Sequence, residues 1–270
     1  MNLLGQPAHV GRHCGSNVYE AEKAVVDFYA DALGDRHPLQ AQYAPPLLYH
    51  SECYKFVGEW YLKNLFGNLH GRQDWFLFAP IPLGARVRTR STIIERYQRR
   101  GRDWVVNETD VMLDATGELL VRGHTHQSFL PPVKDQEQGG FVVDEKTAQK
   151  KVPPPFPTAT GPDLAPLTNY HTDREQAKKL GFPTIVVQGM MSTCFVSQLL
   201  QDHFGEGWLR GGRMSVKLTN VLWVDETVSV HGRIVDEQRE GTQTRIRCEV
   251  WVDKRDGTRI LAGDASALRS

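Results

Sequence analysis

The sequence predicts an α+β protein made of two copies of one unit, each with an antiparallel sheet wrapped around a central helix. Residues 75–129 and 214–268 show the same pattern of alternating apolar and polar positions, broken by turn signals at matching places. Each stretch follows a segment in which apolar residues recur with helical spacing. Joining the two sheets edge to edge covers strand edges that a single unit leaves open, so we expect one long sheet.

A stretch rich in proline and glycine divides the chain near its middle. Residues 131–166 contain repeated prolines, which remove backbone donors and favour extended conformations. We interpret this stretch as a connector between an N-terminal unit, residues 1–130, and a C-terminal unit, residues 167–270.

Two helices are expected before the first sheet. Residues Val18 to Leu33 place apolar side chains on one face, and Gly34 is suited to end this helix. Residues Leu47 to Phe66 read as a longer apolar helix, which we take as the central helix of the first unit. The sheet that follows alternates over residues 86–94 and turns at residues 99–103 and 114–118.

The second unit repeats this order. A short helix is expected from Asp173, a suitable N-cap, to Leu180, with Gly181 as its C-terminal stop. An apolar helix then runs from Met190 to Phe204 and is the central helix of this unit. Its sheet alternates over residues 227–235, with turn signals at residues 239–243 and 253–258.

Composition excludes several classes of function. The 270 residues are 40% hydrophobic and 24% charged, which is sufficient for a large buried core. The 32 basic residues balance the 32 acidic ones, which argues against general binding to nucleic acid or to an anionic membrane. No apolar run could span a bilayer, and the first residues lack the pattern of a secretion signal. The four cysteines show no disulfide or metal-binding spacing, so we expect a soluble cytoplasmic protein without a metal site.

A local motif in each half resembles one enzyme family. The segment from Gly34 through Asp35 and His37 to Gln40 resembles the Gly-Asp-x-Asn-Pro-Leu-His signature of MaoC-like hydratases and dehydratases, which have the hotdog fold. Here His37 replaces the signature Asn, and Gln40 stands where the family has its catalytic His. In the second half, residues 170–191 resemble the family segment that contains His-x-Asp, Gly-Phe and His-Gly-Met. The overall pattern resembles double-hotdog (R)-enoyl-thioester hydratases in which the first copy is degenerate.

The resemblance implies a hydro-lyase that adds water to a 2-enoyl thioester or removes it from a (3R)-3-hydroxyacyl thioester, in fatty acid or polyketide metabolism. Such a reaction needs a base for the water and donors for the oxyanion that develops on the carbonyl. By resemblance, His171 is the base, Asn169 orients the water, and the Gly189 N–H stabilises the enolate. Tyr170, Gln188 and Met190 are then the candidate substrate-binding residues, although Gln188 is equally suited to a structural role in its loop.

The family's catalytic Asp has no counterpart here. It lies five residues before the His, where this sequence has Pro166, and the family Asn matches Thr168 unless the loop is one residue shorter. Three explanations remain open. Asn169 orients the His or the water, a first-half carboxylate such as Glu52 is supplied across the pseudo-twofold axis, or the protein binds acyl thioesters without hydrating them.

The implied partners follow from the substrate. Coenzyme A or the pantetheine of an acyl carrier protein is part of the substrate, and no separate cofactor is expected. A homodimer is the expected assembly. The alternative function is a non-catalytic acyl-thioester-binding or assembly subunit that lacks the catalytic Asp, and a hotdog thioesterase is a third possibility.

Two histidines of the first sheet, His124 and His126, alternate along one predicted strand. A metal site needs convergent ligands with a recognisable spacing, and this pair does not provide them. We interpret both as surface residues.

Overall fold

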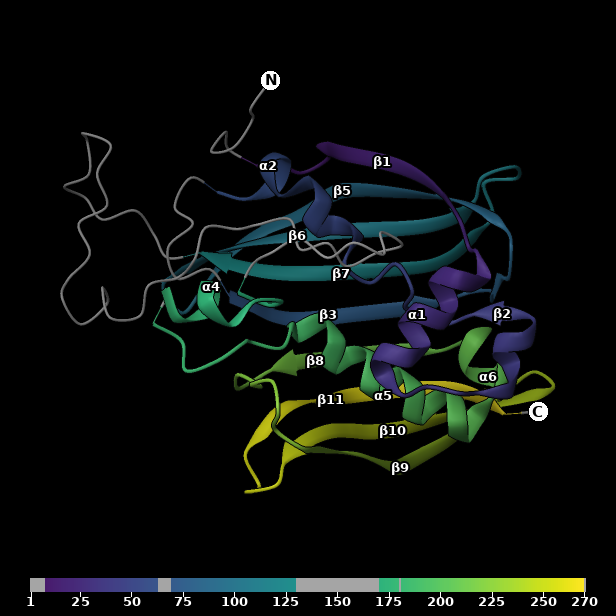
Figure 1. Ribbon diagram of the computed structural model, residues 1–270. Coiled ribbons are helices and arrows are strands. Elements are labelled where there is room, and N and C mark those ends of the chain that lie inside the picture. The colour runs from purple at the N-terminus through teal and green to yellow at the C-terminus, as the bar shows by residue number, and fades with distance from the viewer. Residues whose placement is uncertain (1–7, 63–68, 130–169, 180, 270) are drawn as a thin grey trace.

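A nine-stranded antiparallel sheet runs through the whole molecule (Figure 1). The computed structural model describes residues 8–62, 69–129, 170–179 and 181–269. The strand order is β1-β5-β6-β7-β3-β8-β11-β10-β9. Strands of the first half and of the second half meet at the pair β3 and β8, where Trp75 lies opposite Met214. The predicted α+β class and the joining of two sheets at their edges are therefore confirmed.

The first half supplies five strands of this sheet. They are β1 (His13–Glu20), β3 (Leu69–Leu77), β5 (Arg86–Arg99), β6 (Arg102–Leu113) and β7 (Leu119–Phe129). Two short strands, β2 (Tyr43–Ala44) and β4 (Ile81–Pro82), pair separately. The hairpin between β5 and β6 turns at Arg100 and Gly101, which both have positive φ. This is the geometry that matches the twist of a two-residue hairpin, and it confirms the predicted turn.

The second half supplies the other four strands. They are β8 (Arg213–Leu218), β9 (Val228–Glu240), β10 (Gln243–Lys254) and β11 (Arg259–Arg269). Turns fall at Gly241 and Gly257, each with positive φ, at the two predicted places.

Helices cover one face of the sheet. They are α1 (Lys23–Leu33), α4 (Arg174–Lys179), α5 (Gly189–Phe204) and α6 (Glu206–Leu209), and in Figure 1 the long helices α1 and α5 lie in front of the strands. The Trp75 indole N–H on β3 donates to the Thr193 hydroxyl on α5, 3.2 Å away. The central helix of the second half thus packs against the strand that belongs to the first half.

The first helix starts later than predicted. Residues Val18 to Glu20 belong to β1, because their backbone pairs with β5 from Arg88 to Arg86. Helix α1 begins at Lys23 and ends at Leu33, and the next residue, Gly34, has a φ of 66° and an N–H that donates to the carbonyls of Ala30 and Asp31. The predicted stop at Gly34 is therefore confirmed.

The predicted helix from Leu47 to Phe66 is not continuous. Residues 47–51 form turns, followed by the 3₁₀ helix η2 (Glu52–Phe56) and the short helix α2 (Val57–Trp60). Backbone bonds span three residues, as from the His50 N–H to the Leu47 carbonyl at 3.0 Å. The segment is apolar because the core surrounds it, which a sequence pattern does not distinguish from a long buried helix. Another 3₁₀ turn, η1 (Pro38–Ala41), follows α1.

One hydrophobic core extends through both halves. The largest completely buried side chains include Trp60, Phe129, Met190 and Trp208, which come from different elements of the two halves. Among the described residues, no helix has the length and hydrophobicity needed to cross a membrane. The predicted connector at residues 131–166 lies outside the described residues, and the division into two units stays a prediction.

Candidate active site

His171 lies just before the short helix α4. The Asp173 side chain accepts a hydrogen bond from the Gln176 N–H at 2.8 Å, which makes Asp173 the N-cap of the short helix, as predicted. At the other end, the Gly181 N–H donates to the Lys178 carbonyl, with a φ of 80° at Gly181. Both ends of this helix are thus fixed by local hydrogen bonds.

The His171 ring is held by a backbone carbonyl. Its Nδ1 lies 2.6 Å from the Val186 carbonyl oxygen, which can only accept, so Nδ1 carries the hydrogen. The other nitrogen, Nε2, then presents its lone pair and is the basic atom of the ring. Burial lowers the pKa of His171 to about 4, against the opposing effect of the Val186 hydrogen bond. The imidazole is therefore neutral at physiological pH and able to accept a proton.

Tyr170 packs directly against this ring. The two ring centroids are 3.9 Å apart, and Tyr170 also contacts Phe182 at 5.9 Å. The Tyr170 carbonyl accepts from the Val186 N–H at 3.2 Å, so residues 170, 171 and 186 form one hydrogen-bonded unit. Burial raises the pKa of Tyr170 to about 12, and its hydroxyl stays protonated at neutral pH.

Val186 leads within three residues to the start of α5. Gln188 is nearly buried and extended, and its side chain does not cap the helix. Instead, its amide oxygen faces the Ser51 hydroxyl of the first half at 3.5 Å. The first-turn N–H groups of α5 carry the positive end of the helix dipole, which is the property that suits an oxyanion.

Gly189 allows α5 to begin in a tight space. A Cβ atom at this position would lie 2.6 Å from the Leu218 side chain and 3.4 Å from Nδ1 of His70. The glycine is thus required by close packing against both halves of the molecule. Met190, the next residue, is 1% exposed and lies in the core.

The structure brings together some of the predicted site residues and separates others. His171 and Tyr170 lie in one hydrogen-bonded unit that is linked through Val186 to the segment carrying Gln188 and Gly189. Asn169 lies outside the described residues. Met190 is in the same segment, but its side chain belongs to the core.

Glu52 belongs to a different group of residues. It is completely buried, and its Oε1 accepts from the Asn17 amide, the Tyr19 hydroxyl and the Thr89 hydroxyl at 2.6, 2.8 and 3.0 Å. All three donors come from the first half. These bonds tie Glu52 to β1 and β5 of the first half.

The signature of the first half forms a capping turn. The Asp35 carboxylate accepts from the His37 N–H at 3.2 Å, and the His37 ring accepts from the Leu39 N–H at 3.1 Å. Burial is the main reason why the pKa of Asp35 is raised. The residues that resemble the family signature here serve the turn between α1 and η1.

First-half residues also reach the start of α5, where His70 Nδ1 lies 3.4 Å from the position of a Cβ on Gly189. The Tyr54 ring contacts His70 with centroids 6.4 Å apart. Burial is the main reason why the pKa of Tyr54 is raised well above its usual value. No local motif marks His70, because it reaches the start of α5 only through the pairing of the two halves.

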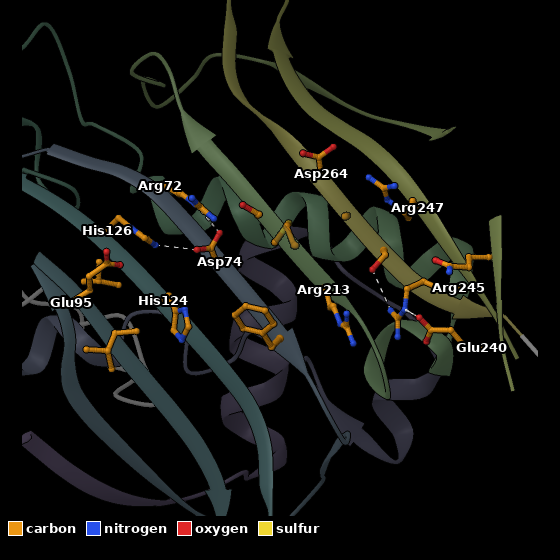
Figure 2. A pocket seen from close by; sticks show the side chains of 18 residues that line it. Arg72, Asp74, Glu95, His124, His126, Arg213, Glu240, Arg245, Arg247 and Asp264 are labelled. Carbon is orange, nitrogen blue, oxygen red and sulfur yellow. Dashed lines mark hydrogen bonds and ion pairs between the residues drawn. The ribbon is translucent and has the colours of Figure 1, made fainter. Parts of the chain in front are cut away.

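The opposite face of the sheet carries a groove of about 680 Å³ (Figure 2). Its β3 residues Arg72 and Asp74 alternate with Gln73 and Trp75, which face the helices. Hydrogen bonds from His126 at 3.0 Å and from Arg72 at 2.9 Å reach Asp74. Burial raises the pKa of Asp74, but these bonds outweigh it and the net shift is downward.

Charged side chains of this groove pair with one another. Arg245 bonds to Glu240 at 2.8 Å at its far end, as Figure 2 shows. His126 is 7% exposed, so its interpretation as a surface residue was wrong; it forms a buried pair with Asp74, whereas His124 pairs with Glu108 at 3.0 Å. Among the described residues, no group of His, Cys, Asp and Glu side chains is arranged to hold a metal ion.

Comparisons with known proteins agree with the architecture. Residues 155–254 match the family model described as "MaoC like domain". No curated protein matches the sequence. A MaoC-like dehydratase from Phytophthora capsici superposes with a TM-score of 0.67 at 16% identity, over 96% of each chain. HtdX from Mycobacterium tuberculosis superposes with a TM-score of 0.59 at 18% identity, over 95% of this chain and 100% of its own.

A third solved structure identifies the type of fold. The Mycobacterium tuberculosis protein Rv0216, described as having a double hotdog fold, superposes with a TM-score of 0.50 at 13% identity, over 96% of each chain. The predicted double hotdog fold is therefore confirmed, and the resemblance to the MaoC-like family is confirmed for residues 155–254.

Proposed function

We propose that this protein catalyses the reversible hydration of 2-enoyl thioesters to (3R)-3-hydroxyacyl thioesters. A MaoC-like domain implies hydratase or dehydratase activity in general. The observation that carries the finer proposal is the bond from His171 Nδ1 to the Val186 carbonyl. It leaves Nε2 as the basic atom of the ring and ties the ring to Val186, which stands three residues before Gly189 at the start of α5. A neutral imidazole and an oxyanion-stabilising helix start are the two groups that this reaction requires.

In the proposed step, His171 Nε2 takes a proton from water while the water oxygen forms a bond to the β-carbon. The electron pair of the double bond moves toward the thioester carbonyl, and the resulting enolate oxygen is stabilised by the N–H of Gly189. The imidazolium then delivers its proton to the α-carbon, so that the ring returns to its neutral form. Dehydration is the reverse of this sequence.

The remaining site residues take supporting roles in the proposal. Asn169 orients the water or the imidazole. Tyr170 and Gln188 form the walls of the substrate site, with Gln188 also joined to the first half through Ser51. Met190 supports the site from the core. The thioester is carried by coenzyme A or by an acyl carrier protein, no cofactor is needed, and the protein acts as a cytoplasmic homodimer.

The test follows the loss of enoyl absorbance when the purified protein is mixed with crotonyl-CoA. We expect turnover in the native protein and a decrease of at least about a hundredfold in His171→Ala, the usual effect of losing a general base. His203→Ala is the matched control, because His203 is exposed in the last turn of α5. A near-native rate in His171→Ala would contradict the assignment.

A second candidate is a non-catalytic acyl-thioester-binding or assembly subunit. The observation that favours it is the absence of an Asp five residues before His171, where the sequence has Pro166. Binding of crotonyl-CoA without loss of absorbance would support this candidate, and turnover that begins only on addition of a partner would indicate an obligate complex. Release of free thiol in the same assay would indicate a thioesterase.

A further inference from the structure

The segment that follows β8 pairs with the residues on either side of Val186. Two backbone hydrogen bonds of 2.9 Å join residues 222–224 to residues 185–187. The bonded pairs of N–H and carbonyl are Val187 with Leu222 and Val224 with Ile185. Val186 and Trp223 lie between these bonds and face each other in an antiparallel bridge. In a pair of this kind, the two facing residues make no backbone bond to each other.

Both backbone groups of Val186 are therefore left for the segment that carries His171. The Val186 N–H donates to the Tyr170 carbonyl at 3.2 Å, and the Val186 carbonyl accepts from His171 Nδ1 at 2.6 Å. Because residues 222–224 hold the neighbours of Val186, they also fix the direction of the carbonyl that selects the tautomer of His171.

A row of aromatic rings links the same two segments through their side chains. The ring centroids of Trp223 and Phe182 are 6.0 Å apart. Phe182 lies 5.9 Å from Tyr170, whose ring contacts that of His171 at 3.9 Å. These separations lie within or just below the range in which aromatic rings attract one another. Trp223 is therefore connected to the imidazole twice, once through the backbone of Val186 and once through stacked side chains.

Charged side chains hold the segment of Trp223 in place. Its N–H donates to Oε2 of Glu226 at 2.8 Å, and the same oxygen lies 2.7 Å from Nζ of Lys254 at the end of β10. Asp225 forms an ion pair with Arg174 at the start of α4. Asp225 has a φ of 74°, which is uncommon outside glycine, so the loop adopts a conformation that these partners stabilise.

We propose that Trp223 is a positioning residue for His171. This inference rests on the proposed function. Trp223 acts through Val186 and through the rings of Phe182 and Tyr170, and together these contacts keep Nδ1 of His171 protonated and Nε2 directed at the reacting water. Trp223 itself exchanges no proton and forms no bond with the substrate.

The crotonyl-CoA assay tests this role. We expect Trp223→Ala to lower kcat by at least about tenfold with KM changed less than about threefold, because the base is misplaced while the substrate still binds. Trp223→Phe keeps a ring at the end of the row and should keep kcat within about threefold of the native value. Trp251→Ala is the matched control and should keep native kcat. Trp251 is also partly buried, but it lies on the opposite face of the sheet from the buried Val250 and Val252.

Glu226 provides variants that leave the aromatic row intact, since its side chain is exposed. Glu226→Gln keeps an oxygen that can accept from the Trp223 N–H, whereas Glu226→Ala removes it. We expect Glu226→Ala to lower kcat by at least about threefold and Glu226→Gln to remain near native. This pair tests the inference even if Trp223→Ala does not fold.

A spectroscopic measurement tests positioning without any turnover. Long-range ¹H–¹⁵N correlation spectra report which ring nitrogen of His171 carries the hydrogen at pH 7. We expect only Nδ1 to be protonated in the native protein and in Trp223→Phe, and a mixture of both tautomers in Trp223→Ala. An unchanged His171 spectrum in Trp223→Ala would overturn the inference.

The remaining outcomes separate the inference from the proposed function. Native turnover together with full activity of both Trp223→Ala and Glu226→Ala would overturn the positioning role alone. An equal loss of kcat in Trp223→Ala and Trp251→Ala would also overturn it, because the effect would then be a general loss of stability. A native protein without turnover, in which the His171 tautomer still depends on Trp223, would overturn the proposed function and support the positioning role.

Discussion

A buried imidazole remains a base to lower pH than an exposed one. His171 has a pKa of about 4 because burial disfavours its charged form. At pH 5.5 such a ring is still about 97% neutral, whereas a ring with the ordinary pKa of 6.5 is only about 9% neutral. We therefore expect kcat/KM for crotonyl-CoA hydration at pH 5.5 to stay within about a factor of two of its value at pH 7.5. A decrease of about tenfold across this interval would show that the catalytic base titrates as an exposed histidine.

Sequence reasoning identified individual residues where the signal was local. Asp173 was predicted as an N-cap from its position at the start of a short helix, and the bond from the Gln176 N–H confirms it. His70 could not be predicted in the same way. Its direction depends on a β-bulge in β3, where Gly71 leaves room for the Trp104 ring of another strand, and its neighbour Gly189 is far away in the sequence.

Some glycines are required by the pairing of whole elements. Gly263 on β11 lies opposite Val216 on β8, and a Cβ atom there would lie 2.0 Å from the Ser215 backbone oxygen. A backbone atom within a sheet cannot move away as a side chain can. We expect Gly263→Ala to lower the free energy of unfolding by several kcal/mol, about 3 or more, because it disturbs the strand that joins the two halves.

Gly58 provides the matched control for this substitution. It lies in α2 without a positive φ, and no atom lies within 4 Å of the position of its Cβ. Gly58→Ala should therefore be neutral or stabilise the protein by up to about 1 kcal/mol. Urea unfolding of the two variants measures the difference. Equal stability of Gly263→Ala and Gly58→Ala would show that β8 and β11 can separate without cost.

Elements with strong turn signals were predicted best. The turn residues Gly101, Gly241 and Gly257 have positive φ, a conformation that glycine in the sequence favours. The segment from Leu47 to Phe66 was predicted less well. Its hydrophobicity reports burial, but the choice between an α-helix and successive 3₁₀ turns depends on how the segment fits inside the curved sheet.

At the scale of the whole molecule, the joined sheet explains why residues of both halves meet at the start of α5. The predicted joining of the two sheets places the start of β3 beside the end of β8, and both lie against the start of α5, with Leu218 and His70 on either side of Gly189. The sequence could predict the repeat and the joined sheet. It could not predict which first-half residues reach the second-half helix, because that depends on the register of β3 with β8.

The same packing makes the whole fold sensitive to acid. His50, His70 and His171 are buried, and burial lowers the pKa of each to about 4. In the unfolded chain these groups titrate near 6.5, so between pH 6.5 and 4 the unfolded state binds more protons than the folded state. Stability is therefore fully present above about pH 6.5 and decreases as the pH falls toward 4. Asp35, whose pKa burial raises, opposes this effect in part.

His50 allows this sensitivity to be measured away from the candidate site. Its Nδ1 bonds to the Leu47 carbonyl at 2.8 Å, and its Nε2 has no hydrogen-bond partner among the described residues. Three such groups give a slope of at most about 4 kcal/mol per pH unit, and His50→Leu should reduce the measured slope by about one third. Urea unfolding at intervals from pH 4.5 to 7.5 provides the slope, with His203→Ala as the exposed control. If the slope of the free energy of unfolding against pH is unchanged in His50→Leu, then His50 binds a proton in the folded state as it does in the unfolded state. The neutral form inferred for the buried histidines would then not hold for His50.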